Sequence, residues 1–230
     1  LGDSKMAKLR SNIVMSNSDM TLKTNYLDYN MASKLAYYYN GANITSKARK
    51  NTIYSKTGSY NSESKQMFFK DDVKLVNEKY TITSDTLIYH TTSEVTYFHG
   101  PTDIVSDSNT IYCENGWYNT QNENASFSRN AKISFSKQFL TGDSVYYDRN
   151  KGIGEAFENV TIEDTTNSTY IKGNYALYNE KTQYALVTKQ PYLVQYNESD
   201  TLFLRADTLE VLNDSIENSY LAYHNVRFYR

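Results

Sequence analysis

The chain has 230 residues, is 39% hydrophobic and has a formal net charge of −2 at pH 7. This length and apolar content suffice for a buried core, so the chain is not a disordered protein. Acidic and basic residues are interspersed without a basic stripe, which argues against a nucleic-acid partner. The 23 tyrosines, the many Thr, Ile and Val residues and the 2 prolines favour strands over helices, so we predict an all-β protein.

The beginning of the chain resembles the middle of a hairpin. Residues 1–10 lack the apolar region of a signal peptide, and no apolar run is long enough for a membrane helix. AKLRSNIVM at 7–15 resembles YYYNGANIT at 37–45, which closes the next hairpin. We therefore expect a half repeat at 7–15, in a mature or truncated chain without its targeting segment.

One hairpin pattern then recurs to the end of the chain. Seven repeats begin near Thr21, Thr52, Thr81, Thr110, Phe139, Tyr170 and Phe203, 29 to 33 residues apart. This spacing is typical of architectures that stack one supersecondary unit. We predict a single repeat domain that spans residues 1–230.

The first strand of each repeat changes its apolar face part-way along. In the third repeat the second, fourth, seventh and ninth positions are Ile82, Ser84, Leu87 and Tyr89. Positions two and four share one face of a strand, whereas seven and nine have the opposite parity. A bulge is therefore expected near Asp85-Thr86 and at the equivalent place in every repeat.

The returning strand changes face as well, at a corner rich in Gly, Asn and Asp. Gly100-Pro101 precedes Ile104, and equivalent corners lie at Asn40-Gly41, Asp71-Asp72 and Asn159. These residue types permit a turn or an interrupted ladder. Stacking such bent hairpins antiparallel predicts an open two-sheet jelly roll, or V-shaped β-fold, whose two apolar faces lie opposite each other.

The apolar seam between these faces has two interpretations, a dry core or a lipid slot. A slot needs small residues such as Gly142 and Gly173 to face open space, whereas a scaffold with a dry core needs them packed against Tyr or Trp. The candidate lipid-lining residues are Leu22, Leu27, Ile53, Ile82, Leu87, Tyr89, Ile104, Ile111, Trp117, Ile133, Leu140, Val145, Ile162 and Ile171.

An open stack also leaves unpaired strand edges at its ends, and such edges recruit further strands. The candidate edge residues for another copy or a partner are Leu9, Ile13, Val14, Val226 and Phe228. The alternative is that these edges result from truncation.

We find no pattern of catalytic or metal-binding residues. His90, His99 and His224 are not spaced with acids or cysteine as zinc ligands would be. The single cysteine, Cys113, takes the small fourth position of its repeat and is interpreted as a buried residue. We expect no enzyme activity, no metal and no cofactor.

Two motifs recur in the repeats, Asp-x-Leu-x-Tyr in the first strand and Asn-Val-x-Ile near the close of the second. They occur, with variations, in SDTLIYH (84–90), GDSVYYD (142–148), ADTLEVL (206–212), NGANI (40–44), ENVTI (158–162) and HNVRF (224–228). In tandem they resemble the OstA/LptA-like lipopolysaccharide-transport family over nearly the whole chain. Asn25, Lys56, Glu114 and Asn174 replace the Asp in four repeats, so we transfer no invariant ligand.

The resemblance implies a non-catalytic β-jelly roll in the periplasm. Such a domain would hold the acyl chains of lipopolysaccharide in an apolar groove, and join similar domains end to end to bridge the inner and outer membranes. The implied partners are lipopolysaccharide and other jelly-roll transport components or further copies of the chain. The rival interpretation is a structural or adhesive β-repeat scaffold with a dry core.

Overall fold

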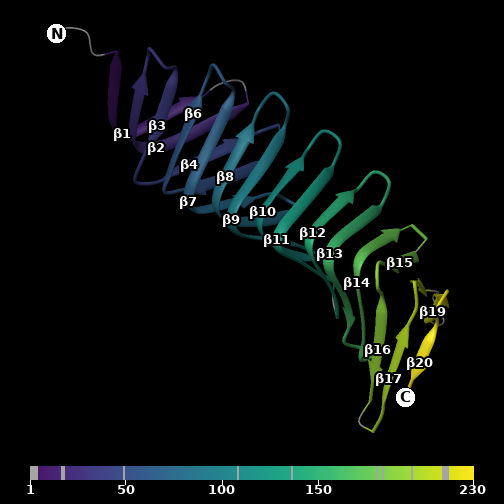
Figure 1. The fold of residues 1–230 in the computed structure, drawn as a ribbon. Coiled ribbons are helices and arrows are strands. Elements are labelled where there is room, and N and C mark those ends of the chain that lie inside the picture. The colour runs from purple at the N-terminus through teal and green to yellow at the C-terminus, as the bar shows by residue number, and fades with distance from the viewer. Residues whose placement is uncertain are drawn as a thin grey trace. The chain divides into compact units, whose positions relative to one another are not determined.

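The fold consists of strands throughout the part of the chain that the structure describes. The structure is a computed structural model, and it describes residues 5–16, 19–48, 50–107, 109–135, 137–179, 181–182, 184–197, 199–213 and 218–230. Every helix or strand assigned in these ranges is a β-strand (Figure 1). The predicted all-β class is confirmed.

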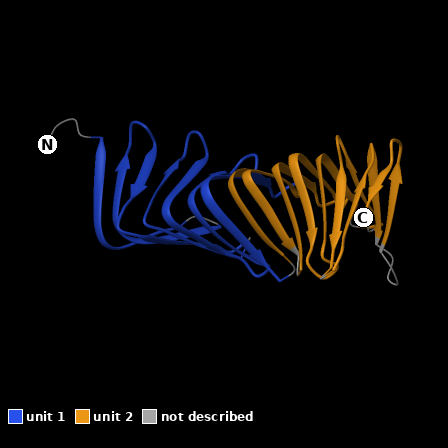
Figure 2. Ribbon diagram, turned by 60° about the horizontal axis from the view of Figure 1, so that its bottom comes forward, with its two compact units in different colours: residues 1–107, 117–121 blue, residues 108–116, 122–230 orange. Residues whose placement is uncertain are grey.

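The chain divides into two compact units (Figure 2). Unit 1 comprises residues 1–107 and 117–121, and unit 2 comprises residues 108–116 and 122–230. The division passes through a strand, β10 (Thr110–Asn119), and not through a linker. The single repeat domain expected from the sequence stays a prediction.

Unit 1 is built from antiparallel hairpins, some of whose strands are broken into two halves. Besides the end of β10, its strands are β1 (Met6–Ser16), β2 (Met20–Asn30), β3 (Leu35–Tyr38), β4 (Ala42–Ser46), β5 (Asn51–Ser55), β6 (Thr57–Asn61), β7 (Gln66–Val76), β8 (Tyr80–His90) and β9 (Val95–Ser106). β3 and β4 are the halves of one bent strand, because both pair with β2. β5 and β6 are likewise halves, and both pair with β7.

Unit 2 repeats this arrangement. Besides the start of β10, its strands are β11 (Asn124–Phe135), β12 (Gln138–Asp148), β13 (Ile153–Asp164), β14 (Thr169–Asn179), β15 (Tyr184–Thr188), β16 (Tyr192–Tyr196), β17 (Thr201–Arg205), β18 (Thr208–Asn213), β19 (Asn218–Tyr223) and β20 (Arg227–Tyr229). After β14 the strands part into two ladders, β14·β15·β18·β19 and β14·β16·β17·β20. The predicted antiparallel stack of bent hairpins is therefore confirmed.

The bends divide each unit into two arms. The first arm contains repeat positions one to four and the strand residues that follow a corner, as in β4, β5, β16 and β17. The second arm contains positions six to ten and the residues that precede a corner, as in β3, β6, β15 and β18. We use these two names below within each unit.

Residues with a left-handed backbone form the corners of the returning strands. Seven corners have two successive residues at positive φ: Ser11-Asn12, Asn40-Gly41, Asp71-Asp72, Arg129-Asn130, Glu158-Asn159, Lys189-Gln190 and His224-Asn225. In the remaining corner Gly100 has a φ of 84° and Pro101 follows it. Two positive φ angles in succession are the backbone of a type I′ turn, and Asn and Gly tolerate them best. The corners predicted at 40–41, 71–72, 100–101 and 159 are confirmed.

The first strand has one unpaired residue where its neighbours have two. Between β8 and β9 the register shifts so that Asp85 lies opposite Gly100-Pro101, and between β7 and β8 it lies opposite Asp71-Asp72. Between β12 and β13 the register shifts at Thr141/Ser144. The predicted irregularity at the fifth position is confirmed in these pairings.

Candidate functional site: the interior of the bent hairpins

The interior of each unit is filled next to the corners. Seventh-position residues Leu27, Leu87 and Val145 are at most 3% exposed, and Phe98 and Val160, on the returning strands, are 1% exposed. These residues come from both arms, so the arms meet along the corners. Leu27, Leu87 and Val145 are therefore part of a closely packed core.

Small fourth-position residues allow the second arm to lie against the first. A Cβ atom added to Gly173 would lie 2.6 Å from Val187 Cγ1 on the second arm, too close for a real contact. One added to Gly142 would lie 3.6 Å from Ala156 Cβ, an ordinary contact. Neither glycine faces open space, and neither has Tyr or Trp among its nearest neighbours. The corner is therefore closely packed at both positions.

Tyr38 also makes a contact between the two arms, through its polar hydroxyl group. Its hydroxyl reaches across from the second arm to Ser55, a fourth-position residue, with which it shares a hydrogen bond. Burial raises the pKa of Tyr38 to about 12 although the bond to Ser55 opposes this. The buried phenol is therefore neutral at physiological pH and satisfied inside the core.

Farther from the corner, both arms become partly accessible. On the first arm, second-position residues Leu22, Ile53, Ile111 and Leu140 are half-buried, in contrast to the seventh position. On the second arm, the ninth position is half-buried in the first six repeats. We call these two rows the first-arm rim and the second-arm rim.

The predicted lining residues fall into three groups. Leu27, Leu87 and Val145 lie in the corner core, and Ile82, Ile133 and Ile171 are at most 7% exposed. A half-buried group consists of Leu22, Ile53, Tyr89, Ile104, Ile111, Leu140 and Ile162. The half-buried group is the accessible part of the seam.

Trp117 forms the third group, because strand alternation puts it on the outer surface. It occupies the eighth position of its repeat, next to buried Gly116. In the third repeat the eighth residue, Ile88, pairs with Tyr97, which is 37% exposed, while the neighbouring pair Leu87 and Phe98 is buried. Trp117 therefore belongs to the outer face and not to the seam.

The two rims approach each other at the end of unit 2. Tyr220 pairs with ninth-position Val211 on the second arm, and its hydroxyl bonds to Thr169, at the start of β14 on the first arm. Burial raises the pKa of Tyr220, while the bond to Thr169 opposes the rise. The seam is narrowed at this point.

The polar motif residues lie on the outer side of the corners, where they bond to each other. Asp143 accepts two bonds of 3.1 Å from Asn159 Nδ2, and Asp207 Oδ2 accepts one of 2.7 Å from Asn225 Nδ2. Where the Asp is replaced, a similar contact persists: Asn130 Nδ2 donates to Glu114 Oε1 at 2.9 Å. These pairs hold the corner in shape, so the motif that carries the resemblance is structural.

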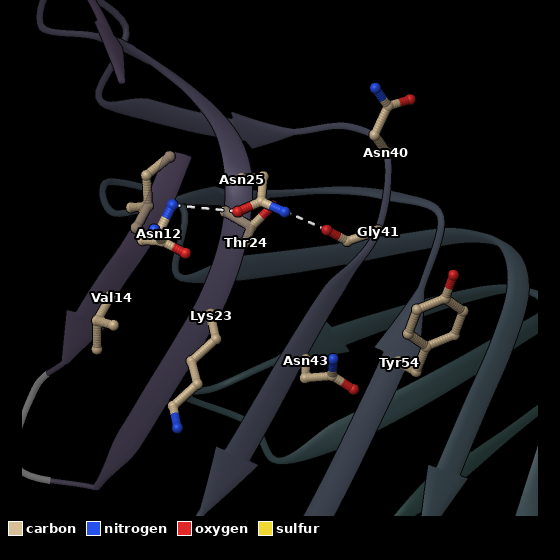
Figure 3. Close-up of a pocket in the computed structure, with 10 residues that line it drawn as sticks. Asn12, Val14, Lys23, Thr24, Asn25, Asn40, Gly41, Asn43 and Tyr54 are labelled. Atoms are coloured by element: carbon tan, nitrogen blue, oxygen red, sulfur yellow. Dashed lines mark hydrogen bonds between the residues drawn. The ribbon is translucent and has the colours of Figure 1, made fainter. Parts of the chain in front are cut away.

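One pocket of about 440 Å³ lies on the outer surface of unit 1, and it differs from the seam (Figure 3). Its lining includes Lys23, Asn25, Asn43 and Tyr54, on three neighbouring strands. Asn25 Oδ1 accepts a 3.1 Å bond from the backbone N–H of Asn12 at the corner of β1. The lining mixes these amide and ammonium groups with the apolar side chains of Ile13 and Val14. The buried hydroxyl of Thr24 and the exposed Lys23 make it a polar surface hollow and not a continuous apolar groove for an acyl chain.

Four of the five predicted edge residues are exposed, on or next to the outermost strands β1 and β20. In unit 1, Leu9 is 42% exposed and Val14 61% exposed, while Ile13 is half-buried. In unit 2, Val226 is 50% and Phe228 60% exposed. Val226 follows its corner as Val160 does, and Val160 is 1% exposed, so the seam is uncovered at β20.

The residues that the structure describes include neither a metal-binding cluster nor a membrane-spanning helix. No group of three or more His, Cys, Asp or Glu side chains in these ranges could hold a metal ion. The same residues contain no helix with the length and hydropathy to cross a membrane. Cys113, the single cysteine of the chain, is fully buried.

Two family models match the sequence. The model described as OstA-like protein matches residues 1–85. The model described as LptA/(LptD N-terminal domain) LPS transport protein matches residues 52–184, more than half of the chain. The chain belongs to this LPS transport family.

Members of the LptA/LptD N-terminal family are transport proteins, not enzymes. A comparison with curated proteins finds no match. Among solved structures, the chain is similar to LptH, described as the LptA-homologous periplasmic component of the lipopolysaccharide transport device of Pseudomonas aeruginosa. The similarity covers 49% of this chain and 85% of LptH, with 14% identity and a TM-score of 0.44.

Sequence reasoning missed two features of the repeats. The first is the bond between the fifth-position acid and the corner Asn, two residues that lie 16 apart in Asp143 and Asn159. The second is that the ninth position is Tyr in the first six repeats. Aligning the repeats column by column would have found both.

Proposed function

We propose that the chain is a periplasmic domain that shields the acyl chains of lipopolysaccharide between its two rims, above the dry corner core. The observation that supports this most is the row of half-buried aliphatic residues on the first-arm rim, in a chain of an LPS transport family. The proposed lining is Leu22, Ile53, Tyr89, Ile104, Ile111, Leu140 and Ile162.

The driving force is hydrophobic. Each methylene that leaves water contributes roughly 0.8 kcal/mol, so several acyl chains are held without a charged clamp. Corner residues such as Leu87 are 1% exposed and have nothing further to bury. Rim residues such as Ile53 and Ile111 still expose apolar surface and gain from a lipid.

End-to-end joining of similar domains is the second part of the proposal. β1 is uncovered in unit 1, with Leu9 42% exposed, and β20 is uncovered in unit 2, with Phe228 60% exposed. Strand addition at either edge would pair backbone groups and cover these side chains. Light scattering should therefore show growth with protein concentration that Leu9→Lys reduces and Lys47→Ala, in an exposed turn, does not. A concentration-independent monomer would count against joining of identical copies.

The dry corner favours one alternative, a structural scaffold whose interior admits nothing. Gly173 packs closely against Val187, which leaves no space for a ligand at the corner. The two functions differ at the rims, because a scaffold has no use for a partly exposed aliphatic row.

A photo-crosslinking amino acid at Ile111 tests the proposal. Ile111 lies on the first-arm rim, and Asn122, an exposed turn residue, is the matched control site. Illumination with purified lipopolysaccharide should give an adduct at Ile111 and none at Asn122. Ile111→Asp should abolish lipid capture with the far-UV circular dichroism unchanged. A folded protein without an adduct at Ile111 would favour the scaffold.

A further inference from the structure

The two rims differ in chemistry. Second-position residues of the first-arm rim are all Leu or Ile. The second-arm rim is Tyr in six repeats: Tyr29, Tyr60, Tyr89, Tyr118, Tyr147 and Tyr178, with Val211 in the last. Four of these tyrosines belong to unit 1 and two to unit 2.

Small residues flank the tyrosines across the ladder. Tyr29 and Tyr60 both pair with Ala36, and Tyr147 pairs with Ala125 and Gly154. Ala36 is 6% exposed and Ala125 4% exposed, although they lie at the level of the half-buried rim. A Cβ added to Gly154 would lie 3.6 Å from Tyr147 Cδ2. Small neighbours therefore leave room for the rings of Tyr29, Tyr60 and Tyr147 on the second-arm rim, whereas Tyr89 lies between Met67 and Thr96.

The residue after each tyrosine is polar. The tenth position is Asn30, Asn61, His90, Asn119, Asp148 and Asn179 in the first six repeats. Its amides and carboxylate fold back on the hairpin turns, as where Asn61 Oδ1 accepts from the backbone N–H groups of Glu63 and Ser64 at 2.9 and 3.0 Å. The tyrosine row is therefore the boundary between the hydrocarbon surface of the seam and the polar turns.

A phenol suits such a boundary, because its ring is apolar and its hydroxyl is a hydrogen-bonding group. Aromatic side chains gather for this reason at the headgroup level of membranes. Leu and Ile on the first-arm rim offer hydrocarbon contact alone.

We propose that this difference orients the lipid: its phosphorylated saccharide lies on the tyrosine row of the second-arm rim, and its acyl chains lie on the Leu/Ile row of the first. This inference rests on the proposed function and adds an orientation to it. The phenols of Tyr29 and Tyr60 donate to phosphate or sugar oxygens, whereas the hydroxyl of Tyr89 is buried and takes no part in this contact. The ring faces contact the first carbons of the acyl chains.

Two lipid probes separate the orientation from simple hydrophobic lining. Purified lipid A has the phosphorylated saccharide, and palmitate has an acyl chain without it. Tyr29→Leu/Tyr60→Leu should weaken lipid A binding about tenfold, since each lost hydrogen bond accounts for roughly a threefold to fivefold change, and should leave palmitate binding within about twofold. Tyr97→Leu, on the outer face of the same arm, should leave both probes unchanged.

Tyr60→Phe is a control for a folding defect, because it keeps the ring and removes only the hydroxyl. It should weaken lipid A about threefold and leave palmitate unaffected, with an unchanged melting temperature. The orientation would be overturned if the double variant lost affinity for lipid A and palmitate equally, or lost no affinity for lipid A. Adducts at Ile111 would persist in either case, so the proposed function would stand. Absence of binding and of Ile111 adducts in the unaltered protein would overturn the proposed function and the orientation together.

Discussion

The corner and the rims of one hairpin are built from similar apolar and aromatic residues, yet they differ in how deeply these side chains are buried. In the third repeat, Leu87 at the corner is 1% exposed, whereas Tyr89, two residues farther along the same face, is half-buried. The corner is closed because side chains of both arms meet there, and the rim is accessible because the arms have separated. Stability should therefore depend on the corner, and ligand binding on the rims.

The largest effect is expected from a cavity in the corner. Leu87→Ala should lower the free energy of unfolding by about 3 kcal/mol, because a fully buried side chain leaves a void. Leu22→Ala makes the same deletion at the half-buried rim and should cost about 1 kcal/mol. Urea unfolding followed by far-UV circular dichroism measures both. Equal losses would mean that corner and rim are packed alike.

Overpacking of the corner comes next. Gly173→Ala should destabilise by about 2 kcal/mol, because its Cβ would lie 2.6 Å from Val187 Cγ1 and 2.9 Å from the Thr188 carbonyl oxygen. Gly142→Ala is the matched control: its nearest contacts would be 3.4 Å, and it should be neutral or slightly stabilising. Unfolding of the two variants in urea should differ accordingly. A stable Gly173→Ala protein would show that the arms separate easily.

The outer side of the corner should be less sensitive. Asn159 has a φ of 50° and donates to Asp143. Asn159→Ala therefore loses the bond and places in the left-handed backbone a residue that tolerates it less well than Asn. We expect a loss of about 1.5 kcal/mol, whereas Asn159→Gly, which keeps the backbone relaxed, should lose under about 1 kcal/mol. Thermal melting compares them. The reverse order would show that the hydrogen bond matters more than the backbone.

The smallest effect concerns a turn beyond the second-arm rim. Asp148 Oδ1 accepts from the Lys151 backbone N–H at 3.0 Å, and this bond, with the Lys151 ammonium, lowers the pKa of Asp148. A lowered pKa in the folded state adds stability above the unfolded pKa, and this is lost as pH falls through the folded value. The difference in melting temperature between the unaltered protein and Asp148→Asn should therefore shrink below about pH 4. If the difference in melting temperature did not depend on pH, the effect of Asp148 would come from the turn geometry alone and not from its charge.

Much of the corner could be predicted from the sequence, because strand alternation is strictly local. Ile82 with Ser84 and Leu87 with Tyr89 have opposite parities, and this requires a bulge at Asp85 whatever the rest of the chain does. The residue types at Gly100-Pro101 and Asn40-Gly41 likewise predict corners, and both corners are observed. Corners at Arg129-Asn130 and Lys189-Gln190 were less evident, since Arg, Lys and Gln have no special preference for positive φ.

The sequence by itself thus determined the repeat, the strand class and the two-sided faces, because these follow from periodicity and from the preferences of single residues. Only the tertiary structure decided which part of the seam is closed. Gly173 meets Val187 from the other arm, and Asp143 meets Asn159 across two strands. Such contacts depend on how far the arms separate, and no local pattern encodes that distance.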